Sequence, residues 1–296
     1  MIEKLYGGIE AGGTKFVCAV GSGPQNIVEE LRFPTTMPVE TVQQVCDFFS
    51  QYINKLYGIG LGSFGPLDAD PASPTYGYFT TTPKPHWGNT NILGMIREKL
   101  DLPISIDMDV AIAGLGEAKW GASRGFNHSL YLTIGTGIGG GYIVNGRPLR
   151  GLFCLEMGHI RIPHNLELDP FRGACPYHGD CFEGLASGPA IQARFGRNAE
   201  TLSEDDPFWD TEAGYVANAL VNYILTLAPE IVIIGGGVMQ KGIMFSKVRA
   251  KVRELLNSYL MNDLLLKNMD KYIVPPLLGN RSGVLGGIAL AMEMNP

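Results

Sequence analysis

A segment rich in cysteine and histidine spans residues 154–181 and has the spacing of a metal site. Four residues in it form the pattern H-x15-C-x2-H-x2-C: His159, Cys175, His178 and Cys181. Thiolates and imidazoles are the ligands that zinc prefers, and the two-residue spacing lets neighbouring ligands close on one ion. Four protein ligands leave no open position for a reacting water. The pattern therefore predicts a structural Zn2+ and disfavours zinc hydrolysis chemistry.

The other cysteines predict packed thiols and not a disulfide framework. Cys18 and Cys46 lie in apolar patterns, where a free buried thiol is the usual state. Cys154 lies outside the metal pattern and is expected to pack as a thiol. Spacing alone leaves the first metal ligand open, because His164 competes with His159.

Three glycine-rich turns have residues that suit a bound phosphate group. The residues concerned are Gly12, Gly13, Thr14 and Lys15, then Gly135, Thr136 and Gly137, and finally Gly235, Gly236 and Gly237. Glycine lets the backbone approach an anion and present amide groups to it. A lone glycine pair is more often an ordinary hairpin turn, but three such turns after strands in two matching halves are improbable as independent accidents. The chain has no Walker A pattern, and the glycines at 135–140 precede a strand pattern, so a P-loop or a Rossmann site is disfavoured.

Two carboxylates, Asp107 and Asp109, follow an apolar strand pattern and precede a helical one. A strand end followed by a helix points a carboxylate into a cleft, where it can act as a general base. Only one carboxylate is needed for this role. Asp109 is equally suited to being a helix N-cap, so position alone does not decide its function.

The elements that must position these residues form a first series up to residue 120. Strands are predicted over 4–10, 15–21, 26–34, 57–66 and 102–109, and helices over 39–57, 91–100 and 110–120. The helix at 39–57 rests on apolar residues at helical spacing, with Pro38 as the start signal. This β-β-β-α-β-α-β-α order predicts an α/β domain with a mixed sheet.

The order then begins again with a second strand, glycine turn and strand over 129–146. Helices are predicted over 182–195, 212–227, 243–260 and 282–293, and strands over 230–238 and 271–277. The second hairpin resembles residues 5–20, which indicates an internal duplication. Two similar halves predict a ligand cleft where their hairpins face each other.

Composition restricts the classes of partner. The chain has 296 residues, with 23 Lys and Arg against 29 Asp and Glu, and a net charge of −6, which disfavours nucleic acid. Mean hydropathy is +0.08, but Gly, Pro or charged residues interrupt every apolar run before membrane-spanning length, so no membrane partner is expected. The amino terminus lacks the regions of a secretion signal. The simplest expectation is a soluble cytoplasmic protein.

Taken together, the motifs resemble the ROK family of sugar kinases over nearly the full chain. They are EAGGTK, TIGTGIGGG, IIGGGV and EMGH followed by C-x2-H-x2-C, and the runs TTTPKPHWGN and HGDCFEGLASGPAI are similar to its bacterial fructokinase branch. The resemblance implies a two-domain actin-like ATPase (ribonuclease H-like) fold of α/β class, with mixed sheets and a central cleft. The implied domains are residues 1–118, joined by a helix at about 282–296, and residues 119–281 with the zinc segment.

The activity that the resemblance implies is ATP-dependent phosphorylation of D-fructose to fructose 6-phosphate with Mg2+. A broader hexokinase acting on glucose, mannose or an amino sugar is the alternative. Transcription regulators of the same family carry a helix-turn-helix ahead of the kinase-like part. Here the first strand pattern begins within about five residues of Met1 and the charge is acidic, so a regulator is disfavoured. The family also implies a homodimer.

The resemblance assigns roles to single residues. It makes Asp109 the catalytic base. It implies that Glu156, His159 and Glu183 contact the sugar, with His159 also the first zinc ligand in preference to His164. Thr14 and Thr136 would face the β and γ phosphates, and Gly235, Gly236 and Gly237 the adenosine side. The zinc is expected to order residues 160–174 and so to fix Glu156 against the sugar.

The chain departs from the family pattern at three positions. Met108 and Ala111 stand where relatives usually carry Asn, which leaves the sugar contacts at those positions open. Glu10 stands where most relatives outside the fructokinase branch carry Asp, and a contact with magnesium through water is expected from it.

Overall fold

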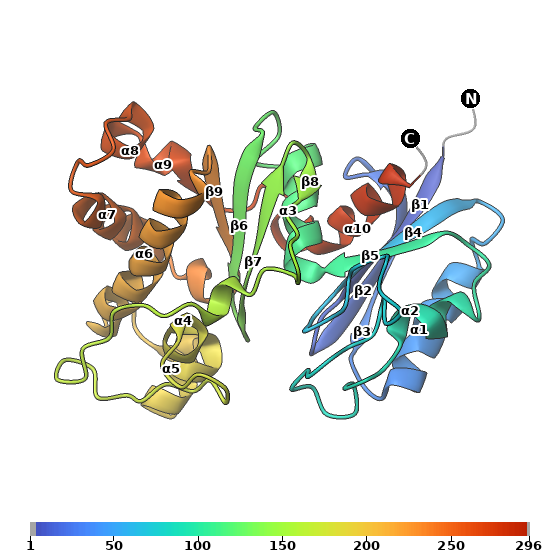
Figure 1. The fold of residues 1–296 in the computed structure, drawn as a ribbon, viewed down its shortest axis with the longest axis horizontal. Coiled ribbons are helices and arrows are strands. Elements are labelled where there is room, and N and C mark those ends of the chain that lie inside the picture. Colours follow the sequence, from blue (N-terminus) through green and yellow to red (C-terminus); the bar gives the residue numbers. More distant parts are fainter. Residues whose placement is uncertain (1–3, 295–296) are drawn as a thin grey trace. The chain divides into compact units, whose positions relative to one another are not determined.

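The computed structural model describes residues 4–294, which form two five-stranded sheets (Figure 1). The first has the order β3-β2-β1-β4-β5 and the second the order β10-β9-β6-β7-β8. The chain divides into two compact units. One contains the chain up to Gly125, Gly141–Leu155 and the segment from Leu277 onward, and the other contains Phe126–Gly140 and Glu156–Pro276.

The first unit is built around the first sheet. Its elements are β1 (Leu5–Ala11), β2 (Lys15–Gly23), β3 (Asn26–Pro34), α1 (Pro38–Ser50), β4 (Leu56–Ser63), α2 (Ile92–Arg97), β5 (Ile104–Met108), α3 (Asp109–Trp120) and, from the last part of the chain, α10 (Ser282–Glu293). β1 pairs antiparallel with β2 and parallel with β4, which pairs parallel with β5. The predicted element order and mixed sheet are confirmed.

Helices cover both faces of this sheet, as the ribbon shows (Figure 1). Alternate residues of β1 point to opposite faces. A Cβ at Gly7 would lie 2.7 Å from Phe49 of α1, and a Cβ at Gly8 would lie 2.2 Å from the Val284 carbonyl oxygen of α10. The absence of side chains there lets both helices approach the strand closely.

The helix predicted over residues 39–57 ends earlier, at Ser50. Its buried face uses the expected apolar residues, among them Val42, Val45 and Phe49. Leu56 continued the helical spacing in the sequence, but it pairs with Leu5 at the start of β4. The hydrogen bonds of the parallel pair therefore override the local helical pattern at these residues.

A buried carboxylate joins α10 to α3. Glu117 of α3 accepts hydrogen bonds from the backbone amides of Leu277 and Leu278, at 3.1 and 3.0 Å, and from the Ser282 hydroxyl at 2.7 Å. It also accepts from the Ala122 amide at 2.7 Å. One fully buried side chain thus fixes the end of α3 and the start of α10.

The second unit is built around the second sheet, whose strand β7 is shared between the two units by residue range. The strands of the second sheet are β6 (His128–Ile134), β7 (Ile138–Val144), β8 (Arg147–Pro148), β9 (Ile231–Gly235) and β10 (Ile273–Val274), and β8 belongs to the first unit by residue range. The helices of the second unit are α4 (Phe182–Ala186), α5 (Gly188–Phe195), α6 (Phe208–Leu227), α7 (Met244–Leu256), α8 (Asp263–Lys267) and α9 (Met269–Tyr272). α6 and α7 pack side by side (Figure 1).

The single helix predicted over 182–195 is wrong, because two helices occupy that range. Ser187 lies between α4 and α5 in an extended conformation, with φ −77° and ψ 161°. Its side chain accepts a hydrogen bond from the Ala190 amide at 3.3 Å, and Pro189 follows in the first turn of α5. A serine N-cap followed by proline is a helix-start signal that the apolar pattern concealed.

The two sheets have the same topology. In sequence order, β6 corresponds to β1, β7 to β2, β8 to β3, β9 to β4 and β10 to β5, and this order is the same in space. β6 pairs parallel with β9 and β9 with β10, as β1 does with β4 and β4 with β5. The internal duplication indicated by the sequence is confirmed in the architecture.

Within residues 4–294, no helix combines the length and the hydropathy needed to cross a membrane.

Candidate functional site

Two carboxylates lie at the carboxyl ends of β1 and β5, two parallel strands of the first sheet that are separated by β4. Sheet register places Ala11, Ser63 and Met108 side by side at the ends of β1, β4 and β5. Glu10 immediately precedes the first of these residues and Asp109 immediately follows the last. The charge of Asp109 acts on Glu10, so the two side chains form one electrostatic site.

Asp109 is the first residue of α3. It is partly buried by the surrounding protein and partly accessible to solvent. Its Oδ1 accepts a hydrogen bond from the Val110 amide at 2.8 Å. Burial raises the pKa of Asp109 to about 6, although the backbone hydrogen bond partly opposes this shift. A carboxyl group that titrates near neutral pH is well matched to accepting and releasing a proton.

Glu10 projects from β1 toward the start of α10. A Cβ at Gly283 would lie 2.6 Å from Glu10 Oε2, so a side chain at residue 283 would displace this carboxylate. Burial, followed by the charge of Asp109, raises the pKa of Glu10 to about 7, while Lys15 and Arg32 act in the opposite direction. Oε2 is buried and makes no hydrogen bond to the residues that the structure describes. A buried oxygen of this kind beside a second carboxylate fits a magnesium site, because Mg2+ prefers oxygen ligands.

Asp107, the other candidate from the sequence, is engaged in an ion pair. Its Oδ2 accepts hydrogen bonds from Arg150 Nε, at 3.0 Å, and from Arg150 Nη2. Arg150 also donates to the Ala69 carbonyl at 3.0 Å. Asp107 is 1% exposed, whereas Asp109 is partly open to solvent. Of the two carboxylates, Asp109 alone is available to a ligand.

The first glycine turn joins β1 to β2 and is held by the residue after β3. The Gly12 amide donates to the Lys15 carbonyl at 2.9 Å. The Thr35 hydroxyl donates to the Gly12 carbonyl at 2.7 Å, and the Thr35 amide donates to the Thr14 carbonyl at 3.0 Å. The side chains of Thr14 and Lys15 are exposed at the tip. This turn therefore presents a hydroxyl and a positive charge to solvent.

The second glycine turn joins β6 to β7 and is held by residues from α4 and α5. The Gly135 amide donates to the Gly137 carbonyl at 2.9 Å, and the Gly188 amide donates to the Gly135 carbonyl at 2.8 Å. Glu183 Oε2 accepts from the Ile138 amide at 2.8 Å. Thr136 is exposed at the tip, as Thr14 is in the first turn.

The third glycine turn lies beside the second. Gly236 has φ +93°, and a Cβ there would lie 2.2 Å from the Ile134 carbonyl oxygen, so the backbone at the ends of β6 and β9 requires glycine. A cavity of ≈ 370 Å³ opens between these turns and α5. Its lining includes Gly135, Thr136, Gly188, Gln192, Asn198, Glu200 and Gly237. This combination of backbone amides and side-chain amides suits a nucleotide.

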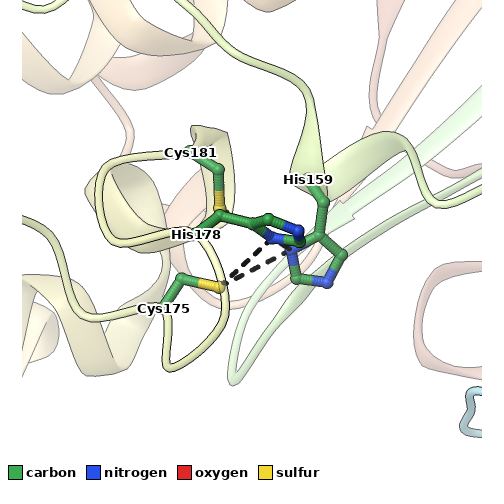
Figure 2. Close-up of side chains that lie close together, drawn as sticks. All are labelled: His159, Cys175, His178 and Cys181. Carbon is green, nitrogen blue, oxygen red and sulfur yellow. Dashed lines mark hydrogen bonds between the residues drawn. The ribbon is translucent and has the colours of Figure 1, made fainter.

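The four predicted metal ligands converge in the second unit (Figure 2). His159 Nδ1 lies 3.7 Å from Cys175 Sγ, 3.6 Å from Cys181 Sγ and 3.3 Å from His178 Nδ1. Cys175 Sγ lies 3.7 Å from His178 Nδ1. With its usual bond lengths, a tetrahedral zinc separates sulfur from nitrogen by about 3.5 Å and nitrogen from nitrogen by about 3.3 Å. The donor atoms therefore have the spacing of a four-coordinate zinc site.

The competing residues lie elsewhere. His164 Nε2 is 3.0 Å from the Asp169 carbonyl oxygen and its Nδ1 is 3.3 Å from Asp180 Oδ2, so both ring nitrogens face other partners. Cys154 packs against the core of the first sheet. The metal cluster accordingly contains His159 and neither of these two residues.

Of the residues assigned to the sugar by resemblance, Glu156 is exposed directly before the short 3-10 helix Met157–His159. Its carbonyl accepts from the His159 amide at 3.1 Å. Glu183 Oε1 lies 4.0 Å from His159 Nε2. Glu156 thus lies close to His159 in sequence, and Glu183 lies close to it in space.

Some residues of the site were not found from the sequence. Thr35 holds the first turn, and Gln192, Asn198 and Glu200 line the cavity beside the second. The pair Thr35–Thr36 directly after a strand was a usable signal, because hydroxyl groups often bond to turn backbone. The cavity residues lie in a short helix and the loop after it, and have no distinctive spacing.

Comparison with known proteins gives a consistent result. The model of the ROK family matches residues 6–294. A protein of Bacillus subtilis (strain 168) is 50% identical over 98% of this chain and 96% of its own length. A fructokinase of Lactococcus lactis subsp. cremoris is 46% identical over 99% of each chain. The crystal structure of a ROK hexokinase from Thermus thermophilus has a TM-score of 0.79 at 26% identity, covering 98% of this chain and 99% of that one. The predicted fold class, an actin-like ATPase fold with mixed sheets, is confirmed.

Proposed function

We propose that this chain, which belongs to the ROK family, phosphorylates D-fructose with ATP and Mg2+ to give fructose 6-phosphate and ADP. The observation that carries the proposal is the 46% identity with a fructokinase over 99% of each chain. The ROK hexokinase is only 26% identical, which makes a broader hexokinase the second candidate. A solved structure of a ROK family transcriptional regulator is 20% identical and is covered over 78% of its own chain, a likeness that supports the shared fold alone.

In this proposal Asp109 is the catalytic base. The terminal hydroxyl oxygen of fructose attacks the γ-phosphorus, the bond from that phosphorus to the ADP oxygen breaks, and the hydroxyl proton passes to Asp109. A pKa of about 6 leaves the carboxyl mostly ionised at pH 7 and yet basic enough to accept a proton. Glu10 would hold Mg2+ through water, and the bound ion would offset the charge of the phosphates.

The glycine turns are assigned to the nucleotide. Thr14 and Lys15 in the first turn, and Thr136 in the second, are exposed at their tips and would contact the phosphates. Gly235, Gly236 and Gly237 would line the adenosine side, which is supported by the cavity that Gly237 shares with Thr136. Glu156 and His159 are assigned to sugar hydroxyls, since carboxylate oxygens accept from hydroxyl groups.

The metal cluster is assigned to zinc in a structural role. Two thiolates and two imidazoles at tetrahedral spacing support this choice, and four protein ligands leave no position for a reacting water. The family also favours a homodimer, a state that light scattering on the purified protein would test.

A panel of hexoses assayed with ATP and Mg2+ tests the proposed function. We expect a kcat/KM for D-fructose at least about tenfold above those for glucose, mannose and amino sugars, which corresponds to roughly 1.4 kcal/mol of discrimination. Equal rates on several hexoses would favour the hexokinase, and the absence of turnover with every sugar would refute both.

A further inference from the structure

One wall of the cavity beside the second glycine turn is a loop that follows α5. This loop contributes Asn198, Ala199 and Glu200, and the third glycine turn contributes Gly237 and Val238. The two segments are separated in the sequence by α6 and β9. Contacts between them therefore set the width of the cavity.

Lys241 connects these two walls. It directly follows the short 3-10 helix Val238–Gln240, which continues from the third glycine turn. Its Nζ donates to the Glu200 carbonyl at 2.9 Å and to the Leu202 carbonyl at 2.8 Å. An ammonium group has three donors and no acceptor, so two of its three hydrogens are engaged by this loop. The same segment thus carries one wall of the cavity and the group that holds the other.

Two further contacts hold the same loop. Trp209, which is fully buried at the start of α6, donates from Nε1 to the Ser203 carbonyl at 2.7 Å. Its ring centroid lies 5.7 Å from Lys241 Nζ, a distance at which the ring attracts the cation. The Gly242 amide donates to Glu204 Oε1 at 3.3 Å. Residues 200–204 are therefore held by Lys241, by its neighbour and by one buried indole.

The α5 part of the cavity has an anchor of a different kind. α5 contributes Gly188 and Gln192 to the lining. On the same helix, Arg194 Nη2 donates to Asp169 Oδ2 and to the Leu185 carbonyl, both at 3.1 Å. The side chains of this ion pair are only 9% and 10% exposed, whereas Lys241 is half-buried. A change at Lys241 should therefore alter the loop and leave α5 in place.

We propose that Lys241 is a positioning residue for the nucleotide, which holds the cavity wall at residues 198–200 close to the third glycine turn and so sets the affinity for the adenosine part of ATP. The inference rests on the proposed function, because it takes this cavity to receive adenosine. The alternative is that the positive charge attracts the phosphates directly. Both carbonyl bonds direct the ammonium at the loop, so we expect one common effect on every ligand that carries adenosine.

The test compares Lys241→Met, Lys241→Arg and, as a matched control, Lys247→Met. Methionine keeps an unbranched apolar side chain beside Trp209 and removes the donors. Lys247 Nζ pairs with the exposed Asp210 at 2.6 Å, so its substitution removes the same charge from the same unit without changing the loop. Titration calorimetry measures the Kd of a non-hydrolysable ATP analogue, of ADP and of D-fructose.

Lys241→Met should weaken binding of the ATP analogue and of ADP by the same factor of about ten, because it removes two hydrogen bonds from a charged group. The KM for ATP should rise by a similar factor, while kcat and the Kd of fructose stay constant. Amide hydrogen exchange should become faster in residues 198–204 and not in α5. Lys241→Arg keeps donors and should recover most of the affinity, and Lys247→Met should behave as the wild type.

A greater loss for the ATP analogue than for ADP would mean that Lys241 acts on the phosphates, and it would overturn the inference. Equal weakening of fructose binding, an equal effect of Lys247→Met, or unchanged nucleotide affinity in Lys241→Met would overturn it as well. Nucleotide binding is measured without turnover. A wild type that binds the ATP analogue but phosphorylates no hexose therefore refutes the proposed function separately.

Discussion

The two glycine turns are the same backbone device with different supports. Each joins the first two strands of a five-stranded sheet and presents a threonine at its tip. The first turn is held by Thr35, which directly follows the nine-residue strand β3. The corresponding strand of the second sheet, β8, has two residues, and the second turn is held by Glu183. A residue of α4 thus performs in the second half the task that Thr35, after the third strand, performs in the first half.

The halves also differ in their charged groups. β1 and β6 each have seven residues, and Glu10 of the first corresponds to Thr133 of the second. Asp109 directly follows β5, whereas Pro275 directly follows β10. The first half therefore carries acidic residues at both strand ends and the second carries none at these two positions. Under the proposed function, acid–base chemistry and structural metal binding are therefore assigned to different halves of one repeated architecture.

Replacing Asp109 is the strongest test of whether the first half carries the acid–base chemistry. Asp109→Asn keeps the shape of the side chain and removes the base, so kcat should fall by about a thousandfold, while fructose affinity stays nearly constant. Steady-state kinetics with direct measurement of sugar binding decides the outcome. The matched control is Asp107→Asn, which leaves Arg150 without its buried partner and should lower the melting temperature but not kcat. Substantial activity in Asp109→Asn would show that the catalytic base is not Asp109 of the first half.

The pH dependence gives the next largest effect. Burial raises the pKa of Asp109 to about 6, and the base must be ionised to accept the proton. kcat/KM should therefore be constant above pH 7 and fall toward a tenfold loss per unit below pH 6, since it reports the free enzyme. Rate measurements from pH 5 to pH 8 at saturating Mg2+ check this expectation. A profile that stays flat down to pH 5 would show that the group behaves as an ordinary aspartate.

The smallest expected effect concerns the support of the first glycine turn by Thr35. Thr35→Val is nearly isosteric and removes only the hydroxyl that bonds Gly12, so ATP binding should weaken about threefold to tenfold. Metal content should not change in this variant, because the hydroxyl that is removed bonds the backbone of the first turn. The neighbouring substitution Thr36→Val serves as the control. Unchanged ATP binding in Thr35→Val would show that this hydroxyl does not support the first turn.

The local features of this molecule were predictable from its sequence. The glycine turns, the metal ligands and the strand order depend on spacing within short segments, and the structure has them in the expected elements. The choice of His159 over His164 needed the family pattern, because spacing alone does not exclude His164.

Contacts between distant segments were not predictable in this way. Glu183 and Ile138 are 45 residues apart, and their hydrogen bond depends on how α4 packs beside β7. The break at Ser187 was missed because apolar spacing continues through it, although the capping serine and proline were visible. The ion pair that occupies Asp107, and so leaves Asp109 as the carboxylate available to a ligand, likewise depends on a distant residue. Its partner, Arg150, lies 43 residues from Asp107.

The bond between Glu117 and Ser282 has a consequence for the order of folding during synthesis. The two residues are 165 positions apart, and α10 covers β1 and β4 as well as α3. The whole second unit is therefore translated before the first sheet receives its last helix. Until then the strand face at Gly8 and Gly60 has no cover, and the Glu117 carboxylate lacks three of its four donors. A ribosome paused before Leu277 would hold an open, apolar sheet, which is the state that chaperones bind.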